Sequence, residues 1–151
     1  AIGECGLDRF RLDAPFPVQS EMFLRHARLA EETGLPLVIH SVRTDSDILA
    51  AHSSVRPRAA WVLHGFSART GNVDRLLERG IAASFGPREL ARPRASGILG
   101  RIPSELLLLE TDDSGIPIQE VHRTAARLLE TDVDTLARRV AGNWTRIFAP
   151  A

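Results

Sequence analysis

The six residues LPLVIH, Leu35 to His40, form a short apolar run that ends on a histidine. The preceding residues 17–33 carry apolar side chains at helical spacing, and Gly34 is placed to cap that helix with left-handed backbone. Pro36 prevents the helix from continuing into the apolar run. This stretch therefore predicts a helix that leads into a buried strand, the repeating unit of a parallel α/β protein.

The same alternation extends along the chain in both directions. Further apolar runs predict strands at residues 1–5, 59–64, 81–85 and 106–111. Helical periodicity covers residues 45–53, 71–79, 89–99 and 118–130. A last helix follows, in which Thr131 and Asp134 resemble a capping box and Trp144 belongs to the apolar stripe that we expect in the core. Five strands separated by helices predict βαβ units around a parallel sheet.

The composition is that of one ordinary globular domain. Of the 151 residues, 44% are hydrophobic and 25% are charged, which excludes wholesale disorder and makes a single core the default. The 19 basic and 19 acidic residues cancel, so no basic field indicates a nucleic-acid partner, and a nuclease has to be inferred from its site. No apolar run reaches the length of a membrane span, and the single cysteine, Cys5, fits a reducing compartment. We therefore expect a cytoplasmic protein with no membrane partner.

Side chains that bind metals stand at the ends of four predicted strands. Two strands end on His40 and His64, a third leads into Asp112, and Glu4 lies near the end of the first. The carboxyl ends of parallel strands meet at one rim, where the active sites of such folds lie. A lone histidine at a strand end is usually structural, but two imidazoles and two carboxylates form a set that suits a divalent ion such as Zn²⁺ or Mn²⁺. The pattern predicts that Glu4, His40, His64 and Asp112 hold a metal.

Four segments together resemble the TatD family of hydrolases. They are AIGECGLD at residues 1–8, LPLVIHS at 35–41, LHGFS at 63–67 and LLLETD at 107–112. They occur in the order and at about the spacing of that family, and the resemblance covers essentially the whole chain. It implies a (β/α) TIM barrel of the metal-dependent hydrolase type. It also implies a deoxyribonuclease that cleaves DNA phosphodiester bonds with a metal-activated water, using one or two divalent ions such as Mg²⁺, Mn²⁺ or Zn²⁺.

The resemblance also assigns roles to the four candidate ligands. It implies that Glu4 bridges two metals and that His40, His64 and Asp112 are further ligands. Asp112 would in addition orient the attacking water or accept its proton. By this interpretation Glu4 and Asp112 are the catalytic residues. The ligands expected from the strand ends and those implied by the family coincide.

The chain departs from the family pattern at its start and beside two ligands. It contains no Asp-x-His-x-His segment, with which family members usually open, and about five of eight barrel strands are accounted for. We therefore expect residues 1–151 to be one TatD-like hydrolase domain, truncated at its N-terminus, with an incomplete barrel whose open edge promotes self-association. Gly65 and Asp113 stand where many members have cysteine and alanine, which affects the substrate assignment more than the metal assignment.

Residues beside the strand ends are candidates for substrate contacts. Phe66 follows His64 and is a candidate for stacking on a base. Arg88, and after it Arg92, follow the strand at 81–85 and can meet a phosphodiester, although a solvated helix face explains both arginines equally well. Asp8 either steadies the site or forms a local turn. Cys5 should point to the opposite side of the sheet from Glu4 and pack as a buried thiol.

Three functions remain open at this point. The first is a metal-dependent deoxyribonuclease. The second keeps the metal and the barrel but hydrolyses an amide or ester of a small molecule, and the fold alone does not separate it from the first. The third is a truncated barrel fragment without catalysis. The missing histidine segment favours the third function, and the retained Glu4, His40, His64 and Asp112 speak against it.

Overall fold

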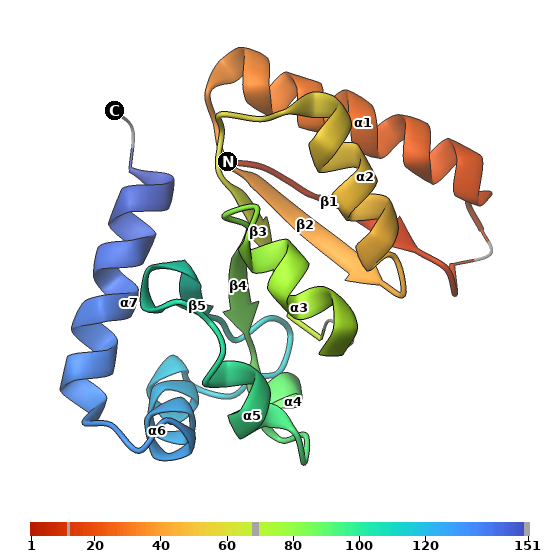
Figure 1. Ribbon diagram of the computed structural model, residues 1–151. Helices are drawn as coiled ribbons and strands as arrows, with labels where there is room; N and C mark the ends of the chain where they lie inside the picture. Colours follow the sequence, from red (N-terminus) through yellow and green to blue (C-terminus); the bar gives the residue numbers. More distant parts are fainter. Residues whose placement is uncertain (12, 68–69, 150–151) are drawn as a thin grey trace.

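The sheet confirms the five strands that the sequence predicts. The computed structural model describes residues 1–11, 13–67 and 70–149. The strands all run parallel and lie side by side in the order of the chain. They are β1 (Ile2–Asp8), β2 (Leu37–Val42), β3 (Trp61–Leu63), β4 (Ala82–Phe85) and β5 (Leu107–Leu109). Sequential parallel strands with helical crossovers are the arrangement found along the wall of a (β/α) barrel (Figure 1).

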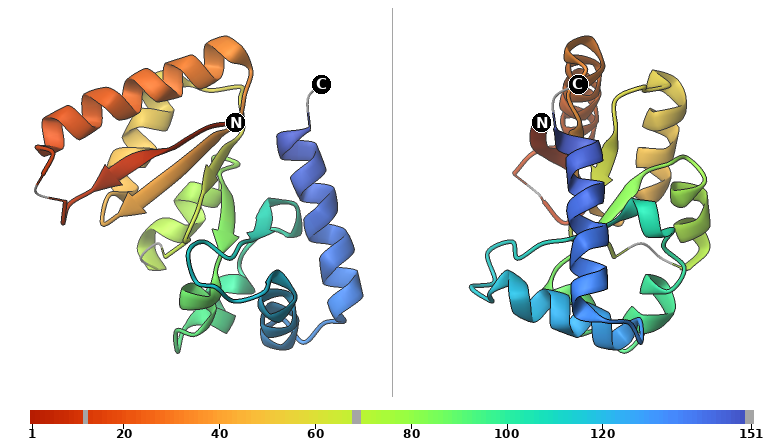
Figure 2. Two further views of the ribbon diagram at one scale, coloured as in Figure 1. Left: turned by 180° about the vertical axis from the view of Figure 1, so that it is seen from behind. Right: turned by 90° about the vertical axis from the view of Figure 1, so that its left-hand side faces the viewer.

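Helices connect the strands and lie mainly on one side of the sheet. The helices are α1 (Phe16–Thr33), α2 (Asp45–Val55), α3 (Thr70–Leu77), α4 (Pro87–Leu90), α5 (Ala95–Leu99), α6 (Ile118–Leu128) and α7 (Val133–Phe148), and a 3₁₀ turn, η1 (Ser104–Leu106), precedes β5. Figure 2 shows α1 and α2 beside β1 and β2, whereas α6 and α7 lie by β5. None of the helices in the described part of the chain combines the length and the apolarity that crossing a bilayer requires.

Of three local expectations from the sequence, one is confirmed by the structure and two differ from it. Gly34 does cap α1, with φ of 67° and its N–H bonded to Ala30 O. The single helix expected at residues 89–99 is instead two short helices, α4 and α5, because Pro93 between them has no N–H and clashes with the preceding turn. The cap of α7 is also one residue away from the expected position. Asp132, rather than Thr131, accepts the bond from Thr135 N at 2.8 Å.

The expectation that Trp144 lies in the core is wrong. Its side chain is 58% exposed, and the buried residue at this turn of α7 is its neighbour Asn143. The Asn143 side-chain amide donates to Ser104 O at 2.7 Å and to Leu107 O at 2.9 Å. A buried amide with two partners is satisfied, so α7 turns a polar side chain toward β5 and leaves the indole outside.

The alternation of side chains along the strands creates two different faces. One face packs against the helices and carries Leu37, Ile39, Trp61, Leu63, Ala83, Phe85 and Leu107. The other face carries Val62, Ala82 and Leu108, which pack on Ile147 of α7. Because successive side chains point to opposite faces, residues an even number of positions beyond this second set share its face. His64, Ser84 and Glu110 therefore point to this second face, and His40 follows Ile39 onto it.

Glycines let β1 approach β2 unusually closely. The register passes from Ile2–Leu37 to Cys5–Ile39, so β1 has one extra residue there, which is a β-bulge. A side chain on Gly3 would place its Cβ 2.6 Å from Val38 O, and one on Gly6 would place it 1.9 Å from His40 O. Only glycine fits at both positions, which flank Glu4 and Cys5. Cys5 packs against the helix-facing core, as expected, and burial together with Glu4 raises the pKa of its thiol to about 12.

Glu31 of α1 holds the segment that leads into β3. Its carboxylate accepts hydrogen bonds from Arg58 N at 2.7 Å, Ala59 N at 3.0 Å and Arg58 Nε at 2.7 Å. The bonds from Ala59 and Arg58 lower the pKa of Glu31 to about 2. A lowered pKa means that ionised Glu31 stabilises the fold above its ordinary pKa and that this contribution is lost as the pH falls toward about 2.

We predict that Glu31→Gln lowers the melting temperature at pH 7 and that the difference from the original protein disappears as the pH falls toward 2. Glutamine retains one acceptor but loses the charge and the second carboxylate oxygen. Thermal melts followed by circular dichroism between pH 2 and 8 measure this difference. Glu32→Gln is the matched control, because Glu32 is the neighbouring glutamate of the same helix and is exposed. A pH-independent difference for Glu31→Gln would show that the ionised clamp does not stabilise the fold.

Candidate metal centre

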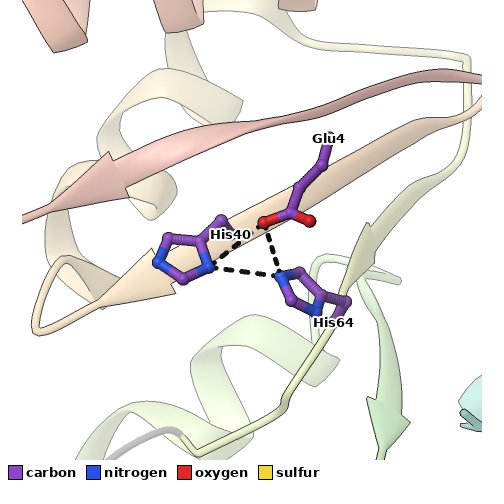
Figure 3. A group of neighbouring side chains, drawn as sticks. All are labelled: Glu4, His40 and His64. Atoms are coloured by element: carbon purple, nitrogen blue, oxygen red, sulfur yellow. Dashed lines mark hydrogen bonds and ion pairs between the residues drawn. The ribbon is translucent and has the colours of Figure 1, made fainter. Parts of the chain in front are cut away.

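Three side chains from adjacent strands bring one donor atom each to a common point (Figure 3). The Nε2 atom of His64 lies 2.9 Å from Glu4 Oε1 and 3.2 Å from His40 Nδ1, and the last pair, His40 Nδ1 and Glu4 Oε1, is 3.3 Å apart. A divalent ion with bonds of about 2.1 Å holds neighbouring ligand atoms about 3.0 to 3.4 Å apart, in octahedral or tetrahedral geometry. Glu4, His40 and His64, the candidate metal centre, therefore fit one such ion.

The fold explains why these three residues meet. Glu4 lies on β1, His40 on β2, and His64 directly follows β3, so they come from three consecutive strands. All three side chains meet on the second face of the sheet, the one that carries Val62 and Leu108. The bulge and the two glycines of β1 bring the Glu4 backbone against β2, which lets its short side chain reach both imidazoles. The convergence predicted for these three strand-end residues is present in the structure.

Each histidine has a carboxylate on its other ring nitrogen. His64 Nδ1 lies 3.5 Å from Glu110 Oε1, and His40 Nε2 lies 3.5 Å from Asp8 Oδ2. The two carboxylate side chains are only 19% and 15% exposed, so water screens these contacts weakly. A carboxylate in this position fixes the orientation of a metal-binding imidazole and raises its basicity. Of the two roles left open for Asp8, the structure provides the contact with the site as well as a local turn.

Glu110 contacts the candidate metal centre but was not among the residues predicted from the sequence. Its Oε1 accepts the Gly65 N–H at 2.7 Å, and Gly65 adopts the left-handed backbone (φ 53°) that directs its N–H there. Glu110 thus fixes both His64 and the turn after it. The signal was available in the sequence, since Glu110 lies two positions after Leu108 and must share its face.

The charges of the site are strongly coupled. The hydrogen bond with Glu110, reinforced by Glu4, outweighs burial and raises the pKa of His64 to about 9. Burial acts to raise the pKa of Glu110, but hydrogen bonds from His64, Ser84 and the Gly65 N–H outweigh it and hold that pKa below its ordinary value. Without a metal, His64 is therefore protonated at neutral pH, and the site contains a positive charge between two carboxylates.

Asp112 lies at the same cavity but outside the cluster of converging donors. It lines a cavity of about 210 Å³ together with His40 and His64. Among the described residues, only Glu4, His40 and His64 form a group in which all donor atoms lie within 4.8 Å of one another. Asp112 has left-handed backbone (φ 46°), which aspartate tolerates better than most residues. Its place as a fourth ligand or as a proton acceptor is thus still a prediction.

The candidate substrate contacts differ in their exposure: the two arginines line the cavity, whereas Phe66 is buried. Arg88 lines the cavity, and its guanidinium pairs with Asp113 at 3.0 Å. Arg92 lines the same cavity and lies 3.7 Å from Glu89. Phe66, in contrast, is 2% exposed and packs against Phe85 with ring centroids 5.4 Å apart. This burial contradicts the stacking role suggested for Phe66, because a ring enclosed in the core offers no face to a base.

Comparisons with known proteins agree on one family. The family model described as TatD related DNase matches residues 1–149. The chain is 36% identical over 123 residues to an Escherichia coli protein named uncharacterized metal-dependent hydrolase YjjV, covering 78% of this chain and 46% of that protein. It is 30% identical over 125 residues to Deoxyribonuclease Tat-D of Schizosaccharomyces pombe, covering 81% and 40%. It is 28% identical over 171 residues to the 3'-5' ssDNA/RNA exonuclease TatD of Dickeya dadantii, covering 99% and 65%.

A solved structure gives the same picture. The crystal structure of the Escherichia coli YjjV protein matches with a TM-score of 0.88 at 28% identity, covering the whole of this chain and 64% of that one. This match confirms the expected fold, a (β/α) barrel of which this chain contains five parallel strands. The chain spans between 40 and 65% of the length of these three relatives.

We predict that Glu110→Gln weakens metal binding about 10- to 100-fold, the usual effect of removing a carboxylate behind a histidine ligand. Glutamine keeps an acceptor for the Gly65 N–H but no longer polarises the imidazole of His64. Isothermal titration calorimetry with Zn²⁺ and Mn²⁺ measures the affinity. Glu105→Gln is the control, an exposed glutamate outside the site on the same segment. Equal affinities for Glu110→Gln and the control would remove Glu110 from the centre.

Proposed function

Because this chain belongs to the TatD-related DNase family, we propose that it is a divalent-metal-dependent hydrolase that cleaves phosphodiester bonds, with DNA as its substrate. The observation that carries the proposal is the convergence of Glu4, His40 and His64 on one point beside an open cavity. The names of two relatives, a deoxyribonuclease and a single-stranded DNA/RNA exonuclease, support the same substrate class.

We assign the metal to Glu4, His40 and His64, with Asp112 as a further ligand. When bound, a divalent ion supplies Lewis acidity, which makes water a nucleophile near neutral pH and offsets the charge of the phosphate. Glu110 and Asp8 keep the imidazoles of His64 and His40 turned toward the centre. Whether one ion or two are held depends on Asp112, since the three converging donors suffice for only one.

We assign the proton chemistry to Asp112. Its carboxylate is exposed at the cavity and can accept the proton of the attacking water at one oxygen. In this proposal Asp112 alone serves as the base for the attacking water. Glu4, in contrast, acts by binding, because its Oε1 already faces both imidazoles. The two carboxylates predicted as catalytic thus have different tasks.

We assign the phosphate contacts to Arg88 and Arg92, on the far side of the cavity from β1. Arginine binds phosphate oxygens in pairs of parallel hydrogen bonds. Both guanidinium groups now rest beside carboxylates, Asp113 and Glu89, which a phosphate would displace or share. Local contacts of this kind allow a chain of zero net charge to bind a polyanion.

We also propose a cytoplasmic location. Cys5 is the only cysteine of the sequence and is a free thiol, so the fold has no need of an oxidising compartment.

We predict that Asp112→Asn reduces metal-dependent turnover of a single-stranded oligonucleotide at least about 100-fold, because asparagine keeps the volume but neither binds a cation well nor accepts a proton. The melting temperature should hardly change, since Asp112 is exposed. Product formation with Mg²⁺ and Mn²⁺ is measured by gel electrophoresis, with Asp134→Asn on α7 as the control. Near-normal turnover by Asp112→Asn would remove Asp112 from the mechanism.

A substrate comparison decides between the substrate classes, with gel electrophoresis for the nucleic acids and chromogenic release for the ester and the amide. Single-stranded DNA, double-stranded DNA, a carboxylic ester and an amide are offered side by side to the original protein with each metal. Hydrolysis of DNA and not of the ester or amide supports the proposal. Metal-dependent hydrolysis of the ester or amide alone would replace it with the small-molecule hydrolase.

A further inference from the structure

One exposed aromatic ring lies at the rim that carries the candidate metal centre. Among the described residues, Phe10 and Trp144 are the aromatic residues with large exposed side chains. Trp144 belongs to α7, at the β5 end of the sheet. Phe10, which is 61% exposed, follows the carboxyl end of β1 by two residues. It is thus at the end of the strands where His40 and His64 also stand.

The guanidinium group of Arg43 lies over the Phe10 ring. The guanidinium carbon of Arg43 lies 4.6 Å from the ring centroid, within cation–π distance. Arg43 directly follows β2, and no carboxylate in the described part of the chain forms an ion pair with it. An arginine positioned over an exposed ring presents a positive charge and a π surface together. Those two features recognise nucleic-acid strands, through the phosphates and the base faces respectively.

The segment that carries this pair is fixed in place. Arg9 N donates to Val42 O at 3.2 Å, Arg9 Nε donates to Arg43 O at 3.2 Å, and its guanidinium pairs with Asp47 at 2.7 Å. These bonds join the turn after β1 to the turn after β2. Phe10 and Arg43 therefore stay neighbours without a ligand, and little conformational entropy remains to be lost on binding.

Asp8 connects this pair to the candidate metal centre. Its Oδ1 accepts the Phe10 N–H at 2.7 Å, while its Oδ2 faces His40 Nε2 at 3.5 Å. A single largely buried carboxylate thus contacts the imidazole of His40 with one oxygen and fixes the turn that carries Phe10 with the other. The ring and the metal centre are held in one fixed relation to each other.

We propose that Phe10 and Arg43 form a subsite for one unpaired nucleobase of the substrate strand. The base stacks on the open part of the Phe10 ring, and Arg43 contacts the adjoining phosphate. The inference rests on the proposed function and adds the residues that select the substrate. Since β1 and β4 lie on opposite sides of β2 and β3, the strand runs from Phe10 across the metal centre to Arg88 and Arg92.

Two consequences for the substrate follow from this subsite. A base that is paired in a duplex has its faces covered by neighbouring pairs, so the ring favours single strands. Stacking requires only a π face, which every base has, so the subsite does not select a sequence.

The test compares binding of two oligonucleotides that differ only in their bases. One is a fluorescein-labelled 12-mer of thymidine, and the other is a 12-mer of abasic residues with the same backbone charge. Fluorescence anisotropy in EDTA measures both affinities without turnover. The original protein should prefer the thymidine strand by roughly 5- to 100-fold, the value of one stacked base. In Phe10→Ala this preference should fall to near one.

Two further variants separate stacking from a general effect of removing a ring. Phe10→Trp should keep or increase the preference, because indole stacks at least as well as benzene. Trp144→Ala, which removes an equally exposed ring at the other end of the sheet, should leave the preference unchanged. Circular dichroism melts check that each variant is folded, which is expected for substitutions of exposed side chains.

The outcomes for the subsite and for the proposed function are distinct. Phe10→Ala with an undiminished preference overturns the subsite, even if the protein cleaves DNA. An original protein that binds neither strand, or both equally, also overturns it. Loss of the preference in Phe10→Ala together with no metal-dependent cleavage by the original protein supports the subsite and refutes the hydrolase.

Discussion

The close approach of β1 to β2 is the constraint on which the rest of the site depends. It requires the absence of side chains at Gly3 and Gly6, where a Cβ would enter the backbone of Val38 or His40. At that separation Glu4 reaches two imidazoles on neighbouring strands, and Asp8 reaches the far side of one of them. A wider gap would leave a carboxylate and two histidines at separate strand ends, each satisfied by water, with no common point for a cation.

The candidate metal centre is organised around a positive charge even before a metal ion binds. Glu4 and Glu110 flank His64, and the Glu110 bond above all keeps that imidazole protonated at neutral pH. A divalent ion would take the place of this proton, since a coordinating imidazole must be neutral at the donor nitrogen. The carboxylates are therefore not left unpaired in either state, which lets a cluster of like charges persist at the rim of a stable sheet.

The sequence alone predicted most of the elements and the convergence of Glu4, His40 and His64, for physical reasons that also explain its failures. The strands and helices could be predicted from the periodicity of apolar residues and from the helix end at Gly34 and Pro36. The position of His40 and His64 at the ends of parallel strands predicted that they lie close together. Contacts between segments distant in the chain could not be read in this way. The bond from Glu110 to Gly65, the burial of Phe66 and the inward turn of Asn143 each depend on which neighbour a side chain meets after the strands are assembled. Trp144 was misplaced because apolar periodicity does not register a buried amide that already has two partners.

That buried amide also has a consequence for biosynthesis. The carbonyl groups of Ser104 and Leu107 find their partner in Asn143, 39 and 36 residues further along the chain. At roughly 5 to 20 residues per second, the ribosome needs about 2 to 8 s to add that stretch. During this interval only water can bond to those two carbonyl groups, so this end of the nascent sheet stays hydrated until α7 is available to pack against it.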